Sequence, residues 1–259
     1  MSTPATTITG NGATLLGERR YEVQGQEVRM PVVVRDASSL AATWLVDTER
    51  ATAMIPGDAF ETVELFPGKS ILSLALIDYR DNDLGDYNEV SVAFFVRPRG
   101  TATGIPYIGT LMDILRSRVS TYICWLPVDQ SFTRDAGDGI WGFPKTVDTI
   151  DYERVSGRAS ATLVAEGQKV LRMSGSAAGA QRIPESTMTT YTYIDGQPHA
   201  TAFTSRSTDC GFRIGGGVEL ELGDHPFADQ LRGLGMSSRP MMSVWMGHMY
   251  ATFQAPVPL

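Results

Sequence analysis

Residues 140–145 have the sequence Ile-Trp-Gly-Phe-Pro-Lys, so Lys145 stands at the end of an apolar, aromatic run. If this run forms a pocket wall, the ammonium of Lys145 loses solvation and its pKa falls. A lysine that is partly neutral near pH 7 is a nucleophile and can form a Schiff base with a ketone. Pro144 restricts its own backbone and that of Phe143, so a stiff segment would aim the lysine. Trp141 and Phe143 are the predicted pocket wall and substrate contacts.

An ordinary surface lysine is the alternative interpretation of Lys145, because lysine stems commonly lie along apolar neighbours while the ammonium stays in water. The chain contains three lysines, and the setting of the other two favours the reactive interpretation. Lys69 lies in a Phe-Pro-Gly-Lys turn, and Lys169 lies at the tip of a predicted hairpin. Lys145 alone has aromatic neighbours and is therefore the candidate nucleophile.

The composition of the 259-residue chain is ordinary for a globular protein, with 42% hydrophobic and 20% charged residues. A net charge of −7 argues against nucleic acid as a general partner, because phosphate binding needs a basic surface. No apolar run reaches the roughly 18 residues of a membrane helix, and the polar N-terminus predicts no secretory signal. Two cysteines in unrelated contexts favour free thiols in a reducing compartment, so we expect a cytoplasmic protein without membrane contact.

Neither a metal nor a cofactor is expected. The three histidines are scattered, and no Cys or His cluster has metal-ligand spacing. The glycine triplet at 215–217 does not match a phosphate loop, because no Lys-Ser or Lys-Thr pair and no helix follow it.

Most of the chain shows the hydrophobic patterns of β-strands. Strands are predicted at or near 28–34, 70–78, 89–96, 121–128, 159–165, 170–174, 187–194, 198–204, 212–222 and 241–253. One helix is predicted to start at 36–40, with Asp36 as N-cap and an apolar stripe that includes Leu40 and Trp44. Two further helices are predicted at 107–119 and 226–234.

Three further segments have loop-like or polar composition. Residues 79–87 are rich in Asp, Asn and Gly and predict a loop. The polar stretch 129–139 leads into the lysine segment. Residues 1–18 predict a flexible N-terminal arm, which leaves 19–259 as a single α+β domain dominated by β-structure.

Phe143-Pro144-Lys145 resembles the active-site signature of the acetoacetate decarboxylase family, Tyr/Phe-Pro-Lys, in which the lysine forms the Schiff base. Residues 84–89, Leu-Gly-Asp-Tyr-Asn-Glu, are similar to the family's Leu-Gly-x-Tyr-x-Glu, whose glutamate lines the active site. Residues 220–228 resemble its Leu-x-Leu-x-Asp-His-x-x-Ala segment. Residues 122–145 align with the family's pre-lysine segment without a gap. Order and approximate spacing are preserved, apart from an extra segment around 99–117 that is either a lid or an oligomer contact.

The resemblance implies an acetoacetate decarboxylase-like β-barrel with flanking helices, usually a homo-oligomer. It implies that Glu89 orients the substrate or handles protons. A family arginine near the N-terminal strand corresponds most nearly to Arg29, which would hold a substrate carboxylate. A solvated carboxylate and a surface ion pair are the alternative interpretations of Glu89 and Arg29.

Two departures from the familiar decarboxylases concern charge. Their lysine is followed by a second lysine, whereas this chain has Thr146, so desolvation would have to lower the pKa of Lys145. A family glutamate aligns near Ser73 or Leu74, so that carboxylate is missing here.

Three functions are compatible with these features. In the leading hypothesis Lys145 forms an imine with a small β-keto acid, and the imine stabilises the carbanion left by CO₂, which makes the protein a carbon–carbon lyase. Proteins similar to this family use the same lysine for aldol condensation and dehydration of 2-oxo acids such as pyruvate, with a C-terminal tyrosine as acid/base. Tyr250 is the candidate for that role, with aromatic packing as the alternative. The third hypothesis is a barrel that binds a small apolar ligand without chemistry, which predicts a solvated Lys145.

Overall fold

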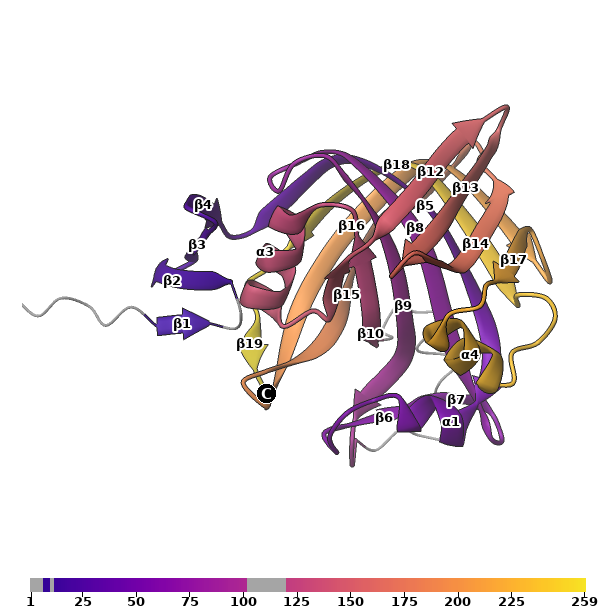
Figure 1. Ribbon diagram of the computed structural model, residues 1–259, viewed down its shortest axis with the longest axis horizontal. Helices are drawn as coiled ribbons and strands as arrows, with labels where there is room; N and C mark the ends of the chain where they lie inside the picture. Colours follow the sequence, from indigo (N-terminus) through magenta and orange to yellow (C-terminus); the bar gives the residue numbers. More distant parts are fainter. Residues whose placement is uncertain (1–6, 10–11, 102–119) are drawn as a thin grey trace, which may run out of the picture.

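The computed structural model describes residues 7–9, 12–101 and 120–259. Seven strands form a barrel in the order β10-β15-β16-β18-β5-β8-β9, and pairing of β9 with β10 closes it (Figure 1). Neighbouring barrel strands are antiparallel except β10 and β15, which are parallel. The barrel strands are β5 (Val32–Asp47), β8 (Lys69–Asn82), β9 (Tyr87–Pro98), β10 (Ser120–Val128), β15 (Gln181–Ile194), β16 (Gln197–Ile214) and β18 (Met242–Phe253). The expected β-dominated class is thus confirmed.

Two four-stranded sheets flank the barrel. The N-terminal sheet consists of β1 (Thr7–Thr9), β2 (Ala13–Gly17), β3 (Arg20–Val23) and β4 (Gln26–Arg29). The second sheet consists of β12 (Thr149–Val155), β13 (Arg158–Ala165), β14 (Gln168–Ser176) and β17 (Val218–Leu222). The barrel sheet is extended by β6 (Phe60–Thr62), β7 (Glu64–Phe66), β11 (Lys145–Val147) and β19 (Val257–Pro258).

Three short helices complete the described structure: α1 (Thr48–Ala53), α3 (Ser131–Trp141) and α4 (Pro226–Gly233). Figure 1 shows α3 beside the N-terminal sheet, on the side of the barrel away from α4 and the second sheet. None of the described helices combines the length and the apolar character needed to cross a membrane.

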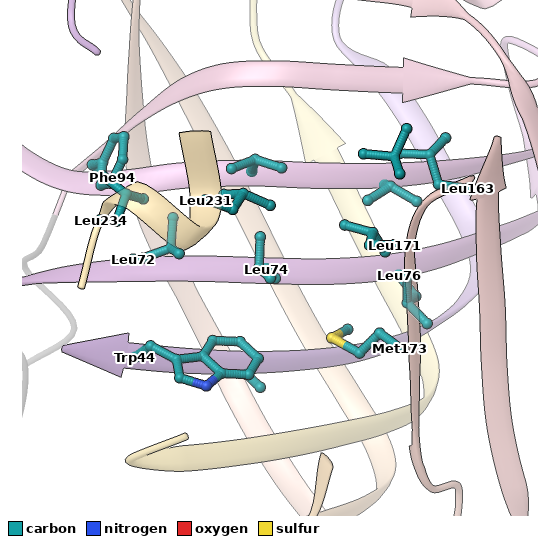
Figure 2. Packing of buried hydrophobic residues seen from close by; sticks show 14 of the residues in the cluster. Trp44, Leu72, Leu74, Leu76, Phe94, Leu163, Leu171, Met173, Leu231 and Leu234 are labelled. Carbon is teal, nitrogen blue, oxygen red and sulfur yellow. The ribbon is translucent and has the colours of Figure 1, made fainter. Parts of the chain in front are cut away.

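The main hydrophobic core lies outside the barrel wall, between β5, β8 and β9 and the second sheet with α4 (Figure 2). Along β8, Leu72, Leu74 and Leu76 are fully buried and point into this core. Side chains alternate across a strand, so the residues between these leucines point into the barrel. Figure 2 shows their partners, which include Trp44, Leu163, Leu171, Met173, Leu231 and Leu234. The barrel wall is therefore covered on one face by core and lines an interior on the other.

Several predicted elements are confirmed by the structure. The pairs β8–β9, β13–β14 and β15–β16 form the expected antiparallel hairpins, and α4 and β18 lie where a helix and a final strand were predicted. The predicted loop at 79–87 is shorter, because β8 continues to Asn82 and β9 begins at Tyr87. The predicted helix at 107–119 and most of the extra segment at 99–117 lie outside the described residues.

The predicted helix start at 36–40 is wrong, because these residues belong to the long strand β5. Leu40 and Trp44 are four residues apart, a spacing that places them on one face of a helix and equally on one face of a strand. In the structure Leu40, Ala42, Trp44 and Val46 all point into the outer core. Both faces of β5 are covered by other parts of the protein, so its sequence lacks the alternation of apolar and polar residues that would identify a strand.

The polar stretch at 129–139 contains most of α3, a helix that the sequence did not predict. Its two glycines and its aspartates disfavour helix intrinsically. Burial of Ala136, Ile140 and Trp141 against the N-terminal sheet and the barrel outweighs that propensity. Part of the expected N-terminal arm is likewise ordered, because residues 13–17 form strand β2 with Ala13 buried.

Arg80 joins three barrel strands where a bulge interrupts the pairing of β5 with β8 near Asp36. Its guanidinium donates to both carboxylate oxygens of Asp36, at 2.8 and 2.9 Å, and to the carbonyl oxygen of Gly247 at 3.2 Å. His248 lies 2.9 Å from the same carboxylate. Hydrogen bonds from Arg80, and then from His248, hold the pKa of Asp36 below its ordinary value.

Asp36→Asn is expected to lower the free energy of unfolding at neutral pH, with a difference from wild type that fades in acid. A carboxyl whose pKa is lower in the folded state stabilises the fold above its unfolded value, about 3.9. That stabilisation is lost as the pH falls through the folded value. Urea unfolding of both proteins between pH 7 and pH 3 measures the difference. A difference that stays constant over this range would contradict the prediction.

Candidate active site

A helix–turn–strand unit places Lys145. Helix α3 ends at Trp141, and Gly142 follows in the left-handed conformation (φ 68°), with its N–H donating to a carbonyl of the last helical turn. A Cβ at position 142 would lie 2.5 Å from the carbonyl oxygen of Tyr193. Glycine is thus required both by the backbone conformation and by the available space. The chain then enters β11, which begins at Lys145 and runs parallel to β10.

The side chain of Lys145 is buried and paired with a carboxylate. It is 4% exposed, and its Nζ lies 2.8 Å from Oε2 of Glu89, whose side chain is 7% exposed. The same Nζ lies 5.1 Å from the centroid of the Tyr87 ring, within the range of a cation–π contact. A buried ion pair stabilises a fold weakly at best, so this arrangement points to a chemical use of the pair.

Gly137 of α3 makes room for the stem of Lys145. A Cβ at position 137 would lie 2.5 Å from Cδ and 2.6 Å from Cε of Lys145. The aliphatic stem therefore lies directly against the helix backbone, and its path to Glu89 depends on the missing side chain.

Two tyrosines surround the other side of Glu89. The hydroxyl of Tyr79 donates to Oε1 of Glu89 at 3.3 Å, and the rings of Tyr79 and Tyr87 stack with centroids 4.5 Å apart. Burial, reinforced by the nearby negative charge of Glu89, raises the pKa of both phenols well above the ordinary value. Both hydroxyls consequently stay protonated and can act as hydrogen-bond donors.

A cavity of about 240 Å³ surrounds this cluster inside the barrel, and all seven barrel strands contribute to its wall. Its aromatic lining residues are Tyr79, Tyr87, Trp141, Phe143, Phe203 and Phe253. Among the described lining residues, Lys145 is the one cation and Glu89 the one anion. In this part of the chain no group of three or more His, Cys, Asp or Glu side chains is arranged to hold a metal ion.

Four of the six site residues predicted from the sequence meet at this cavity: Lys145, Glu89, Trp141 and Phe143. The indole of Trp141 donates to the carbonyl oxygen of Gln254 at 2.8 Å, and its ring stacks on Phe143 with centroids 5.9 Å apart. These contacts fix both aromatic side chains beside the lysine as the predicted pocket wall.

The structure places Arg29 and Tyr250 away from the cavity, which corrects both predictions. The side chain of Arg29 is 78% exposed and pairs with Glu27 at 2.7 Å, as the surface alternative predicted. Tyr250 follows Met249 on β18, and Met249 lines the cavity, so alternation turns Tyr250 to the other face of the strand. There its ring packs 4.6 Å below the guanidinium of Arg206.

The sequence prediction did not include Tyr79, although a signal for it was present. Tyr87 and Glu89 are two residues apart and so share one face of β9. Tyr79 pairs with Tyr87 across the hairpin and therefore reaches the same side. Ser73, one of the two positions aligned with a missing carboxylate, lines the cavity, whereas Leu74 points into the outer core.

Sequence comparison agrees with this geometry. The protein-family model for acetoacetate decarboxylase matches residues 19–255. The chain belongs to the acetoacetate decarboxylase family. Comparison with curated protein sequences gives no match.

Solved structures of acetoacetate decarboxylase-like proteins have the same fold. Acetoacetate decarboxylase from Legionella pneumophila subsp. pneumophila str. Philadelphia 1 is 16% identical, with a TM-score of 0.61 over 88% of this chain and 87% of that chain. The enduracididine biosynthesis enzyme MppR complexed with pyruvate is 16% identical, with a TM-score of 0.59 over 88% and 90%. An acetoacetate decarboxylase-like enzyme from Sphingomonas wittichii RW1 is 15% identical, with a TM-score of 0.56 over 91% and 96%.

This acetoacetate decarboxylase family member has a polar residue, Thr146, after its lysine. The Thr146 hydroxyl accepts from the indole of Trp125 at 3.0 Å and donates to Asp148 at 2.5 Å. These bonds hold Thr146 among partners of its own, separate from the pair formed by Lys145 and Glu89. The charge environment of the lysine is therefore set by Glu89 and by burial.

Proposed function

We propose that this protein is a Schiff-base-forming carbon–carbon lyase that decarboxylates a β-keto acid, with Lys145 as the nucleophile. The observation that carries the proposal is the burial of the lysine amine 2.8 Å from Glu89 in a largely apolar cavity. Membership of the acetoacetate decarboxylase family supports the same chemistry. The burial of the lysine also weighs against the non-catalytic barrel, which predicted a solvated Lys145.

In the proposed reaction Glu89 takes a proton from the Lys145 ammonium, and the neutral amine adds to the ketone carbon of the substrate. Loss of water leaves a protonated imine. The bond between the α-carbon and the carboxylate then breaks, CO₂ leaves, and its electron pair forms an enamine with the imine. The proton first taken from Lys145 leaves with the departing water, so a second proton, taken up from solvent through Glu89, is added to the α-carbon. Water then hydrolyses the resulting protonated imine, which releases the ketone and restores the Lys145 ammonium.

Tyr79 suits the role of a residue that positions Glu89. Its hydroxyl donates to Oε1, which leaves Oε2 directed at the lysine amine. Because burial raises the pKa of Tyr79 well above its ordinary value, the phenol remains a donor throughout the working pH range. A carboxylate held at one oxygen keeps its second oxygen available for proton transfer.

Aldol condensation and dehydration of a 2-oxo acid is a less favoured reaction for this site. Structures of MppR, which has the same fold, include complexes with pyruvate and with the condensation product of pyruvate and imidazole 4-carboxaldehyde. In this chain the residue proposed as acid/base for that reaction, Tyr250, lies on the outer face of β18. Arg29, the proposed anchor for a carboxylate, is exposed. Arg29 would serve either reaction, because both substrates have a carboxylate, so the position of Tyr250 alone disfavours the condensation.

Borohydride trapping tests the proposal. The protein is incubated separately with acetoacetate and with pyruvate, reduced, and analysed by intact mass and peptide mapping. We expect a reduced adduct on the peptide that contains Lys145, and CO₂ release from the β-keto acid. Lys145→Met, which retains the length of the stem, is expected to abolish both. Lys169→Ala removes an exposed lysine and serves as the matched control that retains both. An adduct confined to Lys69 or Lys169, or none with any ketone, would refute the proposal.

A further inference from the structure

The cavity is larger than acetoacetate requires. An apolar protein cavity of about 150 Å³ holds benzene, with about six non-hydrogen atoms. At the same density, the cavity of about 240 Å³ admits about nine or ten such atoms. Acetoacetate, with its carbons and oxygens together, occupies about seven of these. Space for about two or three further atoms therefore remains beside it.

The additional space comes from small side chains at inward positions of β5, β8 and β9. Beyond Glu89, which contacts the lysine amine, two rows of residues cross these strands in register. The first row is Ala41, Ala75 and Ser91, and the second is Ser73 and Ala93. Two residues along a strand advance about 6.6 Å, so the second row lies roughly 13 Å from Glu89. The cavity thus extends along the barrel wall in a direction that leads away from the reacting amine.

The side chains that line this extension of the cavity suit an uncharged alkyl chain of a ligand. Its described wall contains alanine methyls and small hydroxyls, and no cation or anion beyond Lys145 and Glu89. An ionised group placed there would lose its hydration without gaining a partner. Met188, Met246 and Met249 also line the cavity, and flexible thioether side chains adapt readily to an apolar ligand.

We propose that the substrate is a β-keto acid with an unbranched chain of about six or seven carbons in total, estimated from the cavity volume. Its ketone lies at Lys145, and its alkyl chain follows the two rows of small residues. The inference deepens the proposed function and rests on it for the reacting group. The recognition of the substrate's alkyl chain depends on the cavity alone and is tested separately.

Catalytic preference is tested with β-keto acids of increasing length. CO₂ release is measured for acetoacetate, 3-oxohexanoate, 3-oxooctanoate and 3-oxododecanoate. We expect kcat/KM to rise about fourfold per added methylene up to about seven carbons, the factor that follows from burying one methylene. No further gain is expected beyond that length. A constant kcat/KM, or a maximum at acetoacetate, would overturn the inference.

Filling the first row of small residues provides the variant test. Ala75→Leu is expected to reverse the order of substrates, lowering kcat/KM for 3-oxohexanoate over about 16-fold more than for acetoacetate, which exceeds the gain from burying two methylenes. Ser91→Val fills the same row with a smaller group and is used if Ala75→Leu does not fold. The matched control is Ala180→Leu, the same change at an exposed position, which is expected to retain the wild-type order. If both cavity variants kept the wild-type order of kcat/KM among the substrates, the proposed path of the alkyl chain would be contradicted.

A binding experiment separates this inference from the proposed chemistry. Lys145→Met cannot form an imine, and its affinity for 2-butanone, 2-hexanone and 2-octanone is measured by calorimetry. We expect affinity to rise about fourfold per methylene. If affinity rises but the wild-type protein forms no adduct, the recognition of the chain stands and the lyase proposal fails. If adducts form without any dependence on length, the lyase proposal stands and this inference fails.

Discussion

Glu89→Gln is expected to reduce turnover of the β-keto acid by about 10²–10⁴-fold, the usual contribution of a positioned acid/base. Glutamine has the size of glutamate and keeps an acceptor near the amine, but it cannot take the proton of Lys145. The buried amine, 4% exposed to solvent, would then have no positioned base to take its proton and no positioned acid for the later steps. Steady-state CO₂ release measures the loss. Turnover within threefold of wild type would show that another group accepts the proton.

The same substitution is expected to lower the free energy of unfolding by about 3–5 kcal/mol, because it leaves a buried cation without its counter-ion. Lys145→Met alone is expected to be destabilising as well. The double variant Glu89→Gln/Lys145→Met removes both charges and is expected to lie within about 1 kcal/mol of wild type. Urea unfolding of the four proteins completes a double-mutant cycle. Additive losses in the cycle would show that the two side chains are not coupled as the 2.8 Å contact indicates.

Gly137→Ala is expected to lower the rates of adduct formation and turnover about 10²-fold while leaving the protein folded. The new methyl would occupy the space of Cδ and Cε of Lys145, at 2.5 and 2.6 Å, and the flexible stem would have to move. Displacement of a reacting group by about 1 Å commonly lowers rates by about 10²-fold. In helix α3 the change also replaces glycine by a better helix former, which adds up to about 1 kcal/mol of helix propensity. Thermal stability should therefore be retained or rise while activity falls.

Gly233→Ala is the matched control, because Gly233 also lies in a helix and a Cβ there meets no atom within 4 Å. Borohydride trapping, CO₂ release and thermal unfolding are measured for both variants. The control is expected to retain trapping and turnover. If Gly137→Ala retained wild-type trapping, the stem of Lys145 would not depend on the space beside α3. If Gly137→Ala unfolded instead, the contact between Gly137 and the Lys145 stem would serve mainly to stabilise the fold.

The alternation along β8 and β9 explains why much of the barrel could be predicted from the sequence. Strands that pair with near neighbours, such as β8 with β9 and β15 with β16, carry their signal in local hydrophobic pattern and turn residues. The long strand β5 was mistaken for a helix start because burial of both faces erased the alternation. Helix α3 was missed because its stability comes from tertiary burial of Ile140 and Trp141, which outweighs the glycines and aspartates of the segment.

Lys145, Glu89, Trp141 and Phe143 could be assigned to the site from the sequence, because they lie in short motifs whose residue types carry the chemistry. Tyr250 could not be placed correctly, because a shift of one position turns a side chain to the opposite face of a strand. Bulges in the pairing of β18 with β5 prevent a count along the sequence from determining that face. Arg29 lies outside the barrel strands, in β4, so proximity to the site depended wholly on how the N-terminal sheet packs.

The sequence by itself indicated Lys145 as the candidate nucleophile, Glu89 as a site residue through the family resemblance, and the β-rich class, because these depend on residue types and on short motifs. Only the tertiary structure decided that Tyr79 joins the pair, that Gly137 admits the lysine stem, and that two rows of small residues leave room for a longer chain. The physical reason is that a cavity is defined by side chains from all seven strands at once. Its volume is set by the register and curvature of the closed barrel, which no single segment encodes.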